Sequence, residues 1–364
     1  MKILIGADLV PTEHTEQKFI DKDLKSLFTN VLPVIEKADR FIINLECALT
    51  TSDNAIKKFG PNLKAHPDCA FALKELGVTD VMLSNNHTFD FGIEGLKDTL
   101  SALDRAGLPY AGIGENDEDS RQIYYIEKDG LTIAIVDVCE HEYTYALPDR
   151  MGANPYDPYL TMQDVRKARA TADKVIVIYH GGKEFCGYPS PRLRLLCREL
   201  VHNGADVVIT QHSHCIGCYE EYDGAHILYG QGNLQFCYDN MSKGWYTSLL
   251  VELDINEDIK IKFYPLRTLH DSVYIPDGDD AKEIMDAFSK RNDELKTGEW
   301  KKGWHDFCLE RRAVYDSTLK NISGTDTQTH DTQLFAHFLD CEAHTDVWRE
   351  LYPTWNLTNE KEDK

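Results

Sequence analysis

Polar side chains that bind metal ions or move protons follow five of the expected strands, at the point where each strand ends. They are Asp8, Glu46, the pair Asn86 and His87, His180, and the pair His212 and His214. Imidazole and carboxylate together suit zinc, manganese, iron or nickel, and an asparagine oxygen is a ligand that hard or borderline ions accept. Taken singly, an aspartate after a strand is usually part of a turn or helix cap, and a lone histidine can be an ordinary buried residue of the core. Together they predict a site for divalent metal.

Short apolar runs alternate with helical stretches through about residue 210, and these runs position the polar residues. Strands are expected at 3–5, 41–44, 81–83, 133–138, 175–179 and 207–210, with helices at 67–76, 92–106, 161–172 and 191–203. This alternation is typical of β-α units around a mixed or parallel sheet. Since loops at the carboxyl ends of such strands converge on a ligand, the five polar groups are expected to meet.

The pattern changes after about residue 215. Closely spaced strands at 216–222, 225–230, 246–254 and 259–265 indicate an antiparallel layer that completes the fold. Helices then follow at 279–297, 301–321 and 330–351. We expect an α/β domain over 1–270 and a helical C-terminal appendage over 271–364, packed against the core as a cap or an oligomer contact. The appendage histidines show no metal-binding spacing and are expected at the surface or in packing: His305, His330, His337 and His344.

Composition narrows the class of function. The 61 acidic and 39 basic side chains give a formal charge of -22, which disfavours nucleic-acid binding and fits an acidic surface or carboxylates that meet metal. No apolar run approaches the length that spans a bilayer, and the first residues are too short in apolar core for a signal peptide. The expectation is a cytoplasmic protein without a membrane anchor. Its ten irregularly spaced cysteines are expected to be free, mostly buried thiols.

Five short motifs occur in a characteristic order along residues 1–270. They are NNHTFDFG at 85–92, HGGKEF at 180–185, GADVVI at 204–209, HSH at 212–214 and YGQGN at 229–233. In these motifs the chain resembles the bacterial capsule-synthesis CapA family, also called the poly-γ-glutamate capsule proteins, which belongs with the calcineurin-like metallophosphoesterases. The resemblance implies an α/β fold, a four-layer αββα sandwich of the metallophosphoesterase type, with a two-metal centre at one edge.

The resemblance also implies a ligand set. Glu46 is the expected bridging carboxylate, one metal is completed by Asn86, His180 and His212, and the other is held by Asp8 and His214. A metallophosphoesterase usually begins with Asp-x-His, whereas Val10 stands at the histidine position here. The second metal is therefore expected to bind weakly or to be absent. The cofactor is one or two divalent ions of manganese, iron, zinc or magnesium.

Further residues are expected around the substrate. By the resemblance, His87 is a general acid or phosphate-polarising group, and Asp90 or Glu184 orients it. Lys183 is a candidate for a first contact with an anionic substrate, and Arg192 for a second, with a solvated helix face as the alternative for Arg192.

Two functions fit this site. The first is a metal-dependent, phosphoesterase-like hydrolase that uses a metal-activated water on a small or polymeric anionic substrate. The alternative is a non-enzymatic, polyanion-binding component of capsule or poly-γ-glutamate synthesis. The residue pattern leaves the oligomeric state open.

Overall fold

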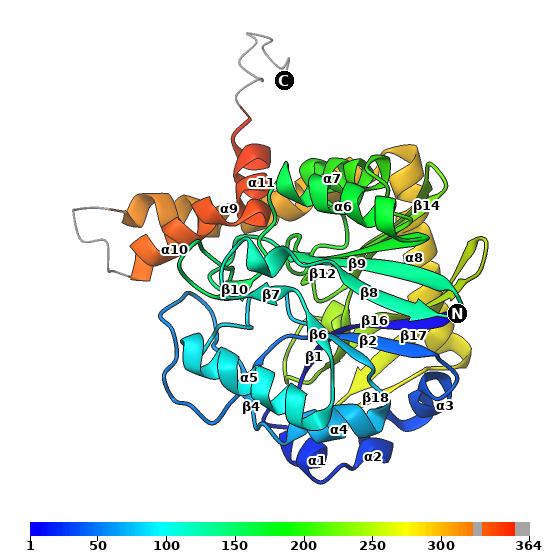
Figure 1. Ribbon diagram of the computed structural model, residues 1–364. Coiled ribbons are helices and arrows are strands. Elements are labelled where there is room, and N and C mark those ends of the chain that lie inside the picture. The colour runs from blue at the N-terminus through cyan, green and yellow to red at the C-terminus, as the bar shows by residue number, and fades with distance from the viewer. Residues whose placement is uncertain (323–329, 354–364) are drawn as a thin grey trace.

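Two β-sheets pack face to face in the computed structural model, which describes residues 1–322 and 330–353 (Figure 1). The eight-stranded sheet has the order β18 (Ser272–Tyr274), β17 (Ile259–Leu269), β16 (Thr247–Ile255), β1 (Lys2–Val10), β2 (Arg40–Leu45), β5 (Asp80–Met82) and β6 (Tyr110–Ala111), and β15 (Asn233–Phe236) pairs with the end of β1. The six-stranded sheet has the order β13 (Ile216–Tyr222), β14 (Ala225–Gln231), β12 (Val207–Gln211), β11 (Lys174–His180), β9 (Leu131–Cys139) and β8 (Tyr124–Lys128).

Two short ribbons and several helical turns complete the connections. β3 (Ala48–Leu49) pairs with β4 (Lys64–Ala65), and β7 (Ile113–Gly114) pairs with β10 (Gly152–Ala153). The 3-10 turns are η1 (Thr29–Val31), η2 (Asp119–Arg121) and η3 (Lys243–Tyr246). Between β2 and β5, residues 50–63 run without regular secondary structure and pass close to the carboxyl edge of the larger sheet.

Alternating side chains explain why the sheets form two inner layers. In β1, Ile3 and Ile5 lie in the apolar cluster between the sheets, whereas Leu4 belongs to the cluster under the outer helices. In β11, Ile176 faces the other sheet and Val177 faces the helices on its own side. β1 and β11 therefore bury both of their faces, which is why each is an almost continuous apolar run in the sequence.

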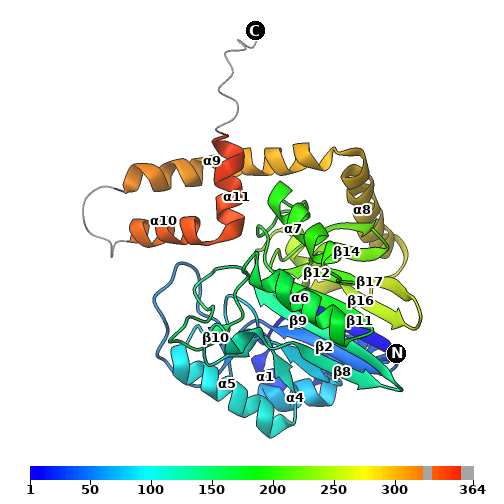
Figure 2. The ribbon, with the colours of Figure 1, turned by 45° about the horizontal axis from the view of Figure 1, so that its top comes forward.

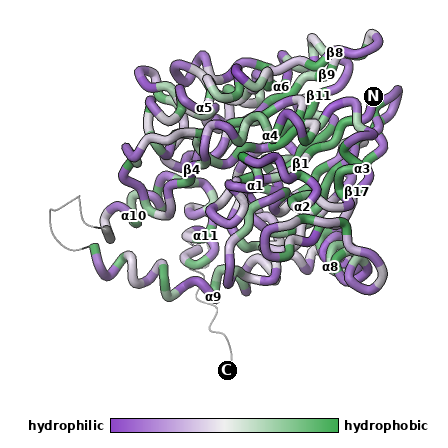
Figure 3. The backbone as a smooth tube through the Cα atoms, turned by 90° about the horizontal axis from the view of Figure 1, so that it is seen from below, coloured by the Kyte–Doolittle hydropathy of each residue, from purple (hydrophilic) through white to green (hydrophobic). Residues whose placement is uncertain are grey.

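Helices cover the outer face of each sheet. The eight-stranded sheet is covered by α1 (Glu16–Ile20), α2 (Leu24–Phe28), α3 (Leu32–Ile35), α4 (Cys69–Leu76) and α5 (Gly92–Ala106), and the six-stranded sheet by α6 (Leu160–Thr171) and α7 (Pro191–His202). α5 ends where Gly107 takes a left-handed backbone with φ 64°, which glycine adopts without steric cost. The predicted four-layer αββα sandwich is confirmed, and the hydrophobic stretches concentrate along its strands (Figure 3).

The antiparallel strands after residue 215 differ from the prediction of one layer. β13 and β14 form the edge of the six-stranded sheet, whereas β16 and β17 belong to the eight-stranded sheet. β14 pairs parallel with β12, and β16 pairs antiparallel with β1, so the chain crosses between sheets through β15. The alternation of apolar and polar residues within a hairpin does not show which sheet the hairpin joins. The sequence pattern therefore did not reveal that the two hairpins belong to different sheets.

Four C-terminal helices follow the sandwich: α8 (Gly278–Thr297), α9 (Trp300–Asn321), α10 (His330–Asp340) and α11 (Glu342–Leu351). The expected helix over 330–351 is broken at Cys341, which has an extended backbone. α8 runs along the sandwich, and α9, α10 and α11 group together at one end (Figure 2). These last three helices, called the roof below, share a core of Trp304, Cys308, Phe338 and Val347. The predicted appendage extends to 364, and its last residues, 354–364, lie outside the described part.

Two sequence expectations concern the whole chain. All ten cysteines are free and buried, as predicted. Within residues 1–322 and 330–353, no helix has the length and apolar character needed to cross a bilayer.

Candidate metal centre

The carboxyl ends of four central strands place the predicted ligands at one point. Asp8 lies in β1, Glu46 directly follows β2, His180 ends β11, and His212 and His214 follow β12. The loop after β5 adds Asn86. His212 and His214 have positive φ angles of 78° and 50°. A non-glycine residue in this region costs about 1–3 kcal/mol, and such strain persists where the surrounding structure holds a functional side chain in place.

His180 lies in the middle of the first ligand set. Its Nε2 is 2.9 Å from Oδ1 of Asn86 and 3.3 Å from Oε1 of Glu46. On the other side of the ring, Nδ1 lies 3.7 Å from Oδ1 of Asp8. The rings of His180 and His212 have centroids 4.9 Å apart. Side chains from four separate segments thus gather around one imidazole.

Two groups of three side chains have the spacing that a metal ion requires. Glu46, His180 and His212 form one group, and Asp8, Glu46 and His214 form the other, with the potential ligand atoms in each group all within 4.8 Å of one another. Glu46 belongs to both. The histidines and carboxylates of the ligand sets that the resemblance implies fall into these two groups, with Glu46 shared. Asn86 is in neither group, although its Oδ1 lies 2.9 Å from Nε2 of His180, and metal binding by these residues stays a prediction.

Buried polar atoms without hydrogen-bond partners indicate that the two ligand groups could hold a metal ion. Both carboxylate oxygens of Glu46 and Nδ1 of His212 are buried without a hydrogen-bond partner among the described residues. A buried polar atom without a partner is costly, and a buried carboxylate more so. A divalent ion coordinated by these atoms removes the cost, so the donor set fits a metal of the kind that binds carboxylate and imidazole.

The electrostatics of the site agree with this fit at His180 and His212, whereas His214 is held in its protonated form. Burial lowers the pKa values of His180 and His212 to about 4, so both rings are neutral near pH 7, as metal ligation requires. Burial and the charge of Asp8 raise the pKa of Glu46 to about 7. Burial also lowers the pKa of His214, but the charge of Glu46 and the hydrogen bond of Asp8 outweigh it and raise this pKa to about 10. The two carboxylates therefore draw positive charge to this point.

The second ligand group lacks a contribution from position 10. Val10 is buried in the apolar cluster beneath the helices and offers no ligand atom. Asn233, which the sequence reasoning missed, lies with its Oδ1 at 2.8 Å from Nδ1 of His214. Asn44 donates to Oδ1 of Asp8 at 2.8 Å. Weak binding of the second ion stays a prediction. The amide side chains of Asn233 and Asn44 contact its expected ligands, His214 and Asp8.

His87 lies beside the ligand groups in a buried cluster. Its Nδ1 is 2.7 Å from Oδ2 of Asp90, so Asp90 is the orienting partner among the two candidates. Lys58, whose side chain is only 2% exposed, pairs with Oδ1 of Asp90, lies 3.1 Å from Nδ1 of His87 and donates to the backbone oxygen of Asn86 at 3.2 Å. Lys58 was missed because it comes from the irregular segment 50–63, where no periodic pattern draws attention to a residue.

Glu142 is a second residue that the sequence reasoning missed. One of its oxygens lies 3.3 Å from Nε2 of His212, and the other lies 3.4 Å from Nε2 of His337 in α10. It therefore joins the metal centre to the roof. Glu142 follows β9 closely, in the same position relative to a strand as the predicted ligands. That signal could have identified it.

The remaining predicted residues lie in different surroundings. Lys183 and Glu184 line a cavity of about 360 Å³ next to His87, and Nζ of Lys183 is 3.4 Å from Oε2 of Glu184. Arg192 does not line this cavity. Its guanidinium donates to Glu140 at 2.9 Å and to Asp346 of α11 at 2.9 and 3.0 Å. This places Arg192 between the sandwich and the roof, and its role toward substrate stays a prediction.

The appendage histidines divide into two kinds. His305 is half exposed and bonds to Glu350, as expected for a surface residue. His337 and His344 are buried and pack against Phe338 and each other, which is the packing alternative of the prediction, and both also line the cavity beside the metal centre. Their position follows from α10 and α11 folding back over the site, which spacing along the chain does not reveal. The side chain of His330 lies outside the described residues.

Comparisons with known proteins agree with the motifs. The family model described as bacterial capsule synthesis protein PGA_cap matches residues 2–238. The capsule biosynthesis protein CapA of Bacillus anthracis is 31% identical over 247 residues, 65% of this chain and 59% of that protein. The PGA biosynthesis protein CapA of Bacillus subtilis strain 168 is 30% identical over 245 residues, 65% of this chain and 62% of that protein. The chain thus spans about three fifths of each relative.

A solved structure, a putative 5'-nucleotidase from Staphylococcus aureus in complex with alpha-ketoglutarate, aligns with a TM-score of 0.45 at 18% identity, covering 78% of this chain and 58% of that one. The family assignment rests on sequence, because the matched segment contains more than half of the chain. The chain belongs to the family of bacterial capsule synthesis proteins described as PGA_cap.

Proposed function

We propose that this chain is a metal-dependent phosphoesterase that hydrolyses an anionic ester at the site beneath the roof. The observation that carries the proposal is the pair of unpartnered oxygens on buried Glu46, shared by two groups of metal-ligand side chains. When bound there, manganese, iron, zinc or magnesium ions acidify water and neutralise charge on a phosphoryl group. The ligand groups hold the ions, and the neighbouring side chains act on the substrate.

His87 is the proposed proton donor. Asp90 accepts a hydrogen bond from its Nδ1, which fixes the ring and leaves Nε2 as the atom that exchanges a proton with substrate. In hydrolysis, the oxygen of water bonds to phosphorus and the ester P–O bond breaks. The leaving oxygen takes the proton from Nε2, and the proton released by water passes to solvent. Lys183, at the cavity wall, attracts the anionic group.

The test is hydrolysis of a phosphoester panel by protein loaded in turn with each of the four metals. His87→Asn is expected to lower kcat by about 10²–10⁴ while the bound metal content stays unchanged, since the substitution removes a proton donor and no ligand. His202→Ala, which changes an exposed histidine outside the site, is the matched control. Metal-loaded wild-type protein that hydrolyses no phosphoester contradicts the proposal.

A second candidate function is binding of a polyanion during capsule or poly-γ-glutamate assembly. The names of the two Bacillus relatives favour it, since both are called biosynthesis proteins. In this function the ligand groups hold metal that contacts carboxylates of the polymer. Saturable binding of polyglutamate that requires metal, without turnover of any ester, supports this candidate. Phosphoester hydrolysis together with an absence of polyglutamate binding excludes it.

A further inference from the structure

The cavity next to the metal centre has walls from two parts of the chain. Its inner wall contains Asn86, His87 and Glu184 from the sandwich. Its outer wall comes from the roof and contains Tyr315 of α9 and Phe338 of α10, with His344 of α11 beside them. Neither part encloses the cavity alone, so the shape of the space depends on how the roof lies over the sandwich.

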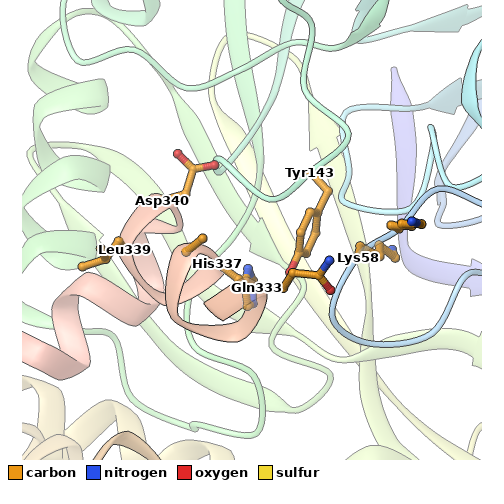
Figure 4. Close-up of a pocket in the computed structure, with 8 residues that line it drawn as sticks. Lys58, Tyr143, Gln333, His337, Leu339 and Asp340 are labelled. Atoms are coloured by element: carbon orange, nitrogen blue, oxygen red, sulfur yellow. The ribbon is translucent and has the colours of Figure 1, made fainter. Parts of the chain in front are cut away.

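The size of this cavity limits what it can hold. Its volume of about 360 Å³ lies near the lower end of the range for small-molecule sites. A second cavity of about 550 Å³ lies outside it, between α10 and the segment around Lys58 (Figure 4). Lys58 and His337 line both cavities, so these two side chains stand where one space meets the other. The inner cavity therefore suits a small ligand that enters past them.

The two ends of the inner cavity differ in chemistry. At the metal end are the polar groups of His87, Glu184 and Lys183. At the roof end, aromatic rings form a stacked series: the centroids of Tyr315 and Phe338 are 4.5 Å apart at 23°, and those of Phe338 and His344 are 4.2 Å apart at 19°. Such a surface gains most from a flat apolar group, because rings prefer stacked or edge contacts with other rings.

The roof lies outside the segment that defines the family. The family model ends at residue 238, whereas α9 begins at Trp300. The ligand groups all lie within the matched segment, since the last of them is His214. The metal end of the cavity is therefore a family feature, and the aromatic end belongs to the remainder of this chain.

We propose that the roof makes this cavity a site for small phosphomonoesters whose leaving group is a compact, flat apolar body of about one ring. The proposal rests on the phosphoesterase function proposed above and adds its substrate class. The phosphate lies at the metal end, and the ring of the leaving group makes edge contacts with the aromatic series of the roof, because the faces of Phe338 are already covered by Tyr315 and His344. A volume of about 360 Å³ holds a small monoester and little more, so the proposal concerns small esters rather than long polymer segments.

Benzyl phosphate and methyl phosphate provide the first test, since the two alcohols released have similar acidity and differ mainly in the ring. We expect kcat/KM for benzyl phosphate to exceed that for methyl phosphate by at least about tenfold, the factor that ~1.4 kcal/mol of apolar contact gives. Equal kcat/KM values for the two esters overturn the proposal. This comparison uses the wild-type protein alone, so it does not depend on the folding of any variant.

Val314→Trp provides the second test. Val314 lines the cavity and is 51% exposed on α9, so a larger side chain fills the space without displacing core. Leu309→Trp is the matched control, because Leu309 is 44% exposed on the same helix and does not line the cavity. We expect Val314→Trp to remove the preference for benzyl phosphate and to raise its KM, with Leu309→Trp unchanged. Loss of preference in both variants, or in neither, contradicts the assigned wall.

Binding of non-hydrolysable phosphonates separates this proposal from the proposed function. Benzylphosphonate and methylphosphonate are titrated into metal-loaded protein and followed by calorimetry. If no ester is hydrolysed but benzylphosphonate binds at least about tenfold tighter and Val314→Trp abolishes the difference, the phosphoesterase function fails and the ligand class stands. If both esters are hydrolysed equally and both phosphonates bind alike, the function stands and the ligand class fails.

Discussion

Arg192 connects the roof to the sandwich, and replacing it by methionine tests how the roof is held. The guanidinium donates to Glu140, which is 3% exposed, and to Asp346 of α11, which is 5% exposed. Ser190 donates to the same Asp346 carboxylate at 2.5 Å. In Arg192→Met the side chain keeps most of its apolar volume, but two buried carboxylates lose the cation between them.

The magnitude follows from those carboxylates. Breaking a buried ion pair by removing one partner costs about 3–5 kcal/mol, because the remaining charge stays buried without compensation. A carboxylate can escape this by taking up a proton. For Glu140, with an ordinary pKa of 4.5, full protonation at pH 7 costs about 3 kcal/mol by the pKa difference. Burial already raises the pKa of Glu140 to about 7, so nearly all of that cost is present in the wild-type protein and Glu140 adds little. Most of the loss comes from Asp346, which gives up both the charge and the hydrogen bonds of Arg192 while it stays buried. We expect a loss near 3 kcal/mol.

Chemical denaturation measures the loss, and limited proteolysis locates it. The roof is expected to detach first, so cleavage between 300 and 351 should rise in Arg192→Met before the sandwich unfolds. Arg198→Met is the control on the same helix, because Arg198 contacts Glu220 and Tyr222 of the sandwich. Its partner Glu220 keeps Arg194 at the same carboxylate, so the control should lose less than about 1 kcal/mol. If the Arg192→Met protein matches this control in stability and in roof cleavage, Arg192 does not hold the roof on the sandwich.

Two further predictions concern the contacts between the roof and the site. Glu142→Gln should weaken metal binding by about 10–100-fold in a competition titration, because the carboxylate that faces Nε2 of His212 orients a ligand; unchanged affinity contradicts this. Burial lowers the pKa of His141, but the hydrogen bond and charge of Glu342 in α11 outweigh burial and raise this pKa above the ordinary value of 6.5. The His141–Glu342 pair therefore stabilises the roof fully below pH 6.5. This stabilisation is lost as the pH rises through the pKa of His141 in the folded protein. Roof proteolysis should therefore increase with pH in the wild-type protein and less so in His141→Asn; a wild-type rate that falls with pH contradicts the assignment.

The sequence predicted those parts of the fold and the site that depend on local pattern. Apolar runs identify strands such as β1 and β11 because these strands bury both faces, and Asp8, Glu46 and His180 stand at strand ends where an α/β sheet gathers ligands. The convergence of these residues also depends on the packing of the two sheets, since Asp8 and Glu46 come from one sheet and His180 from the other. The family motifs added the shared position of Glu46, which residue types alone left open.

The parts that were missed depend on contacts between distant segments. Lys58 comes from a segment without regular secondary structure. Glu142 contacts His337, a residue almost 200 positions later in the chain. The same holds for Arg192, which was predicted to contact substrate or to lie on a solvated helix face and instead pairs with Asp346 of α11. Periodicity carries no information about where a C-terminal helix packs, since an amphipathic face fits any apolar surface of matching shape.

The central claim is that Glu46 and the surrounding side chains bind divalent metal. Elemental analysis of purified protein after metal loading and gel filtration tests it most directly, with Glu46→Gln compared against Glu199→Gln, a change at an exposed helical position. We expect one or two equivalents of metal in the wild-type protein and in Glu199→Gln, and loss of metal in Glu46→Gln, which keeps the shape of the side chain and removes its charge. Equal metal content in all three proteins, or none in the wild type, means that Glu46 does not hold a metal ion.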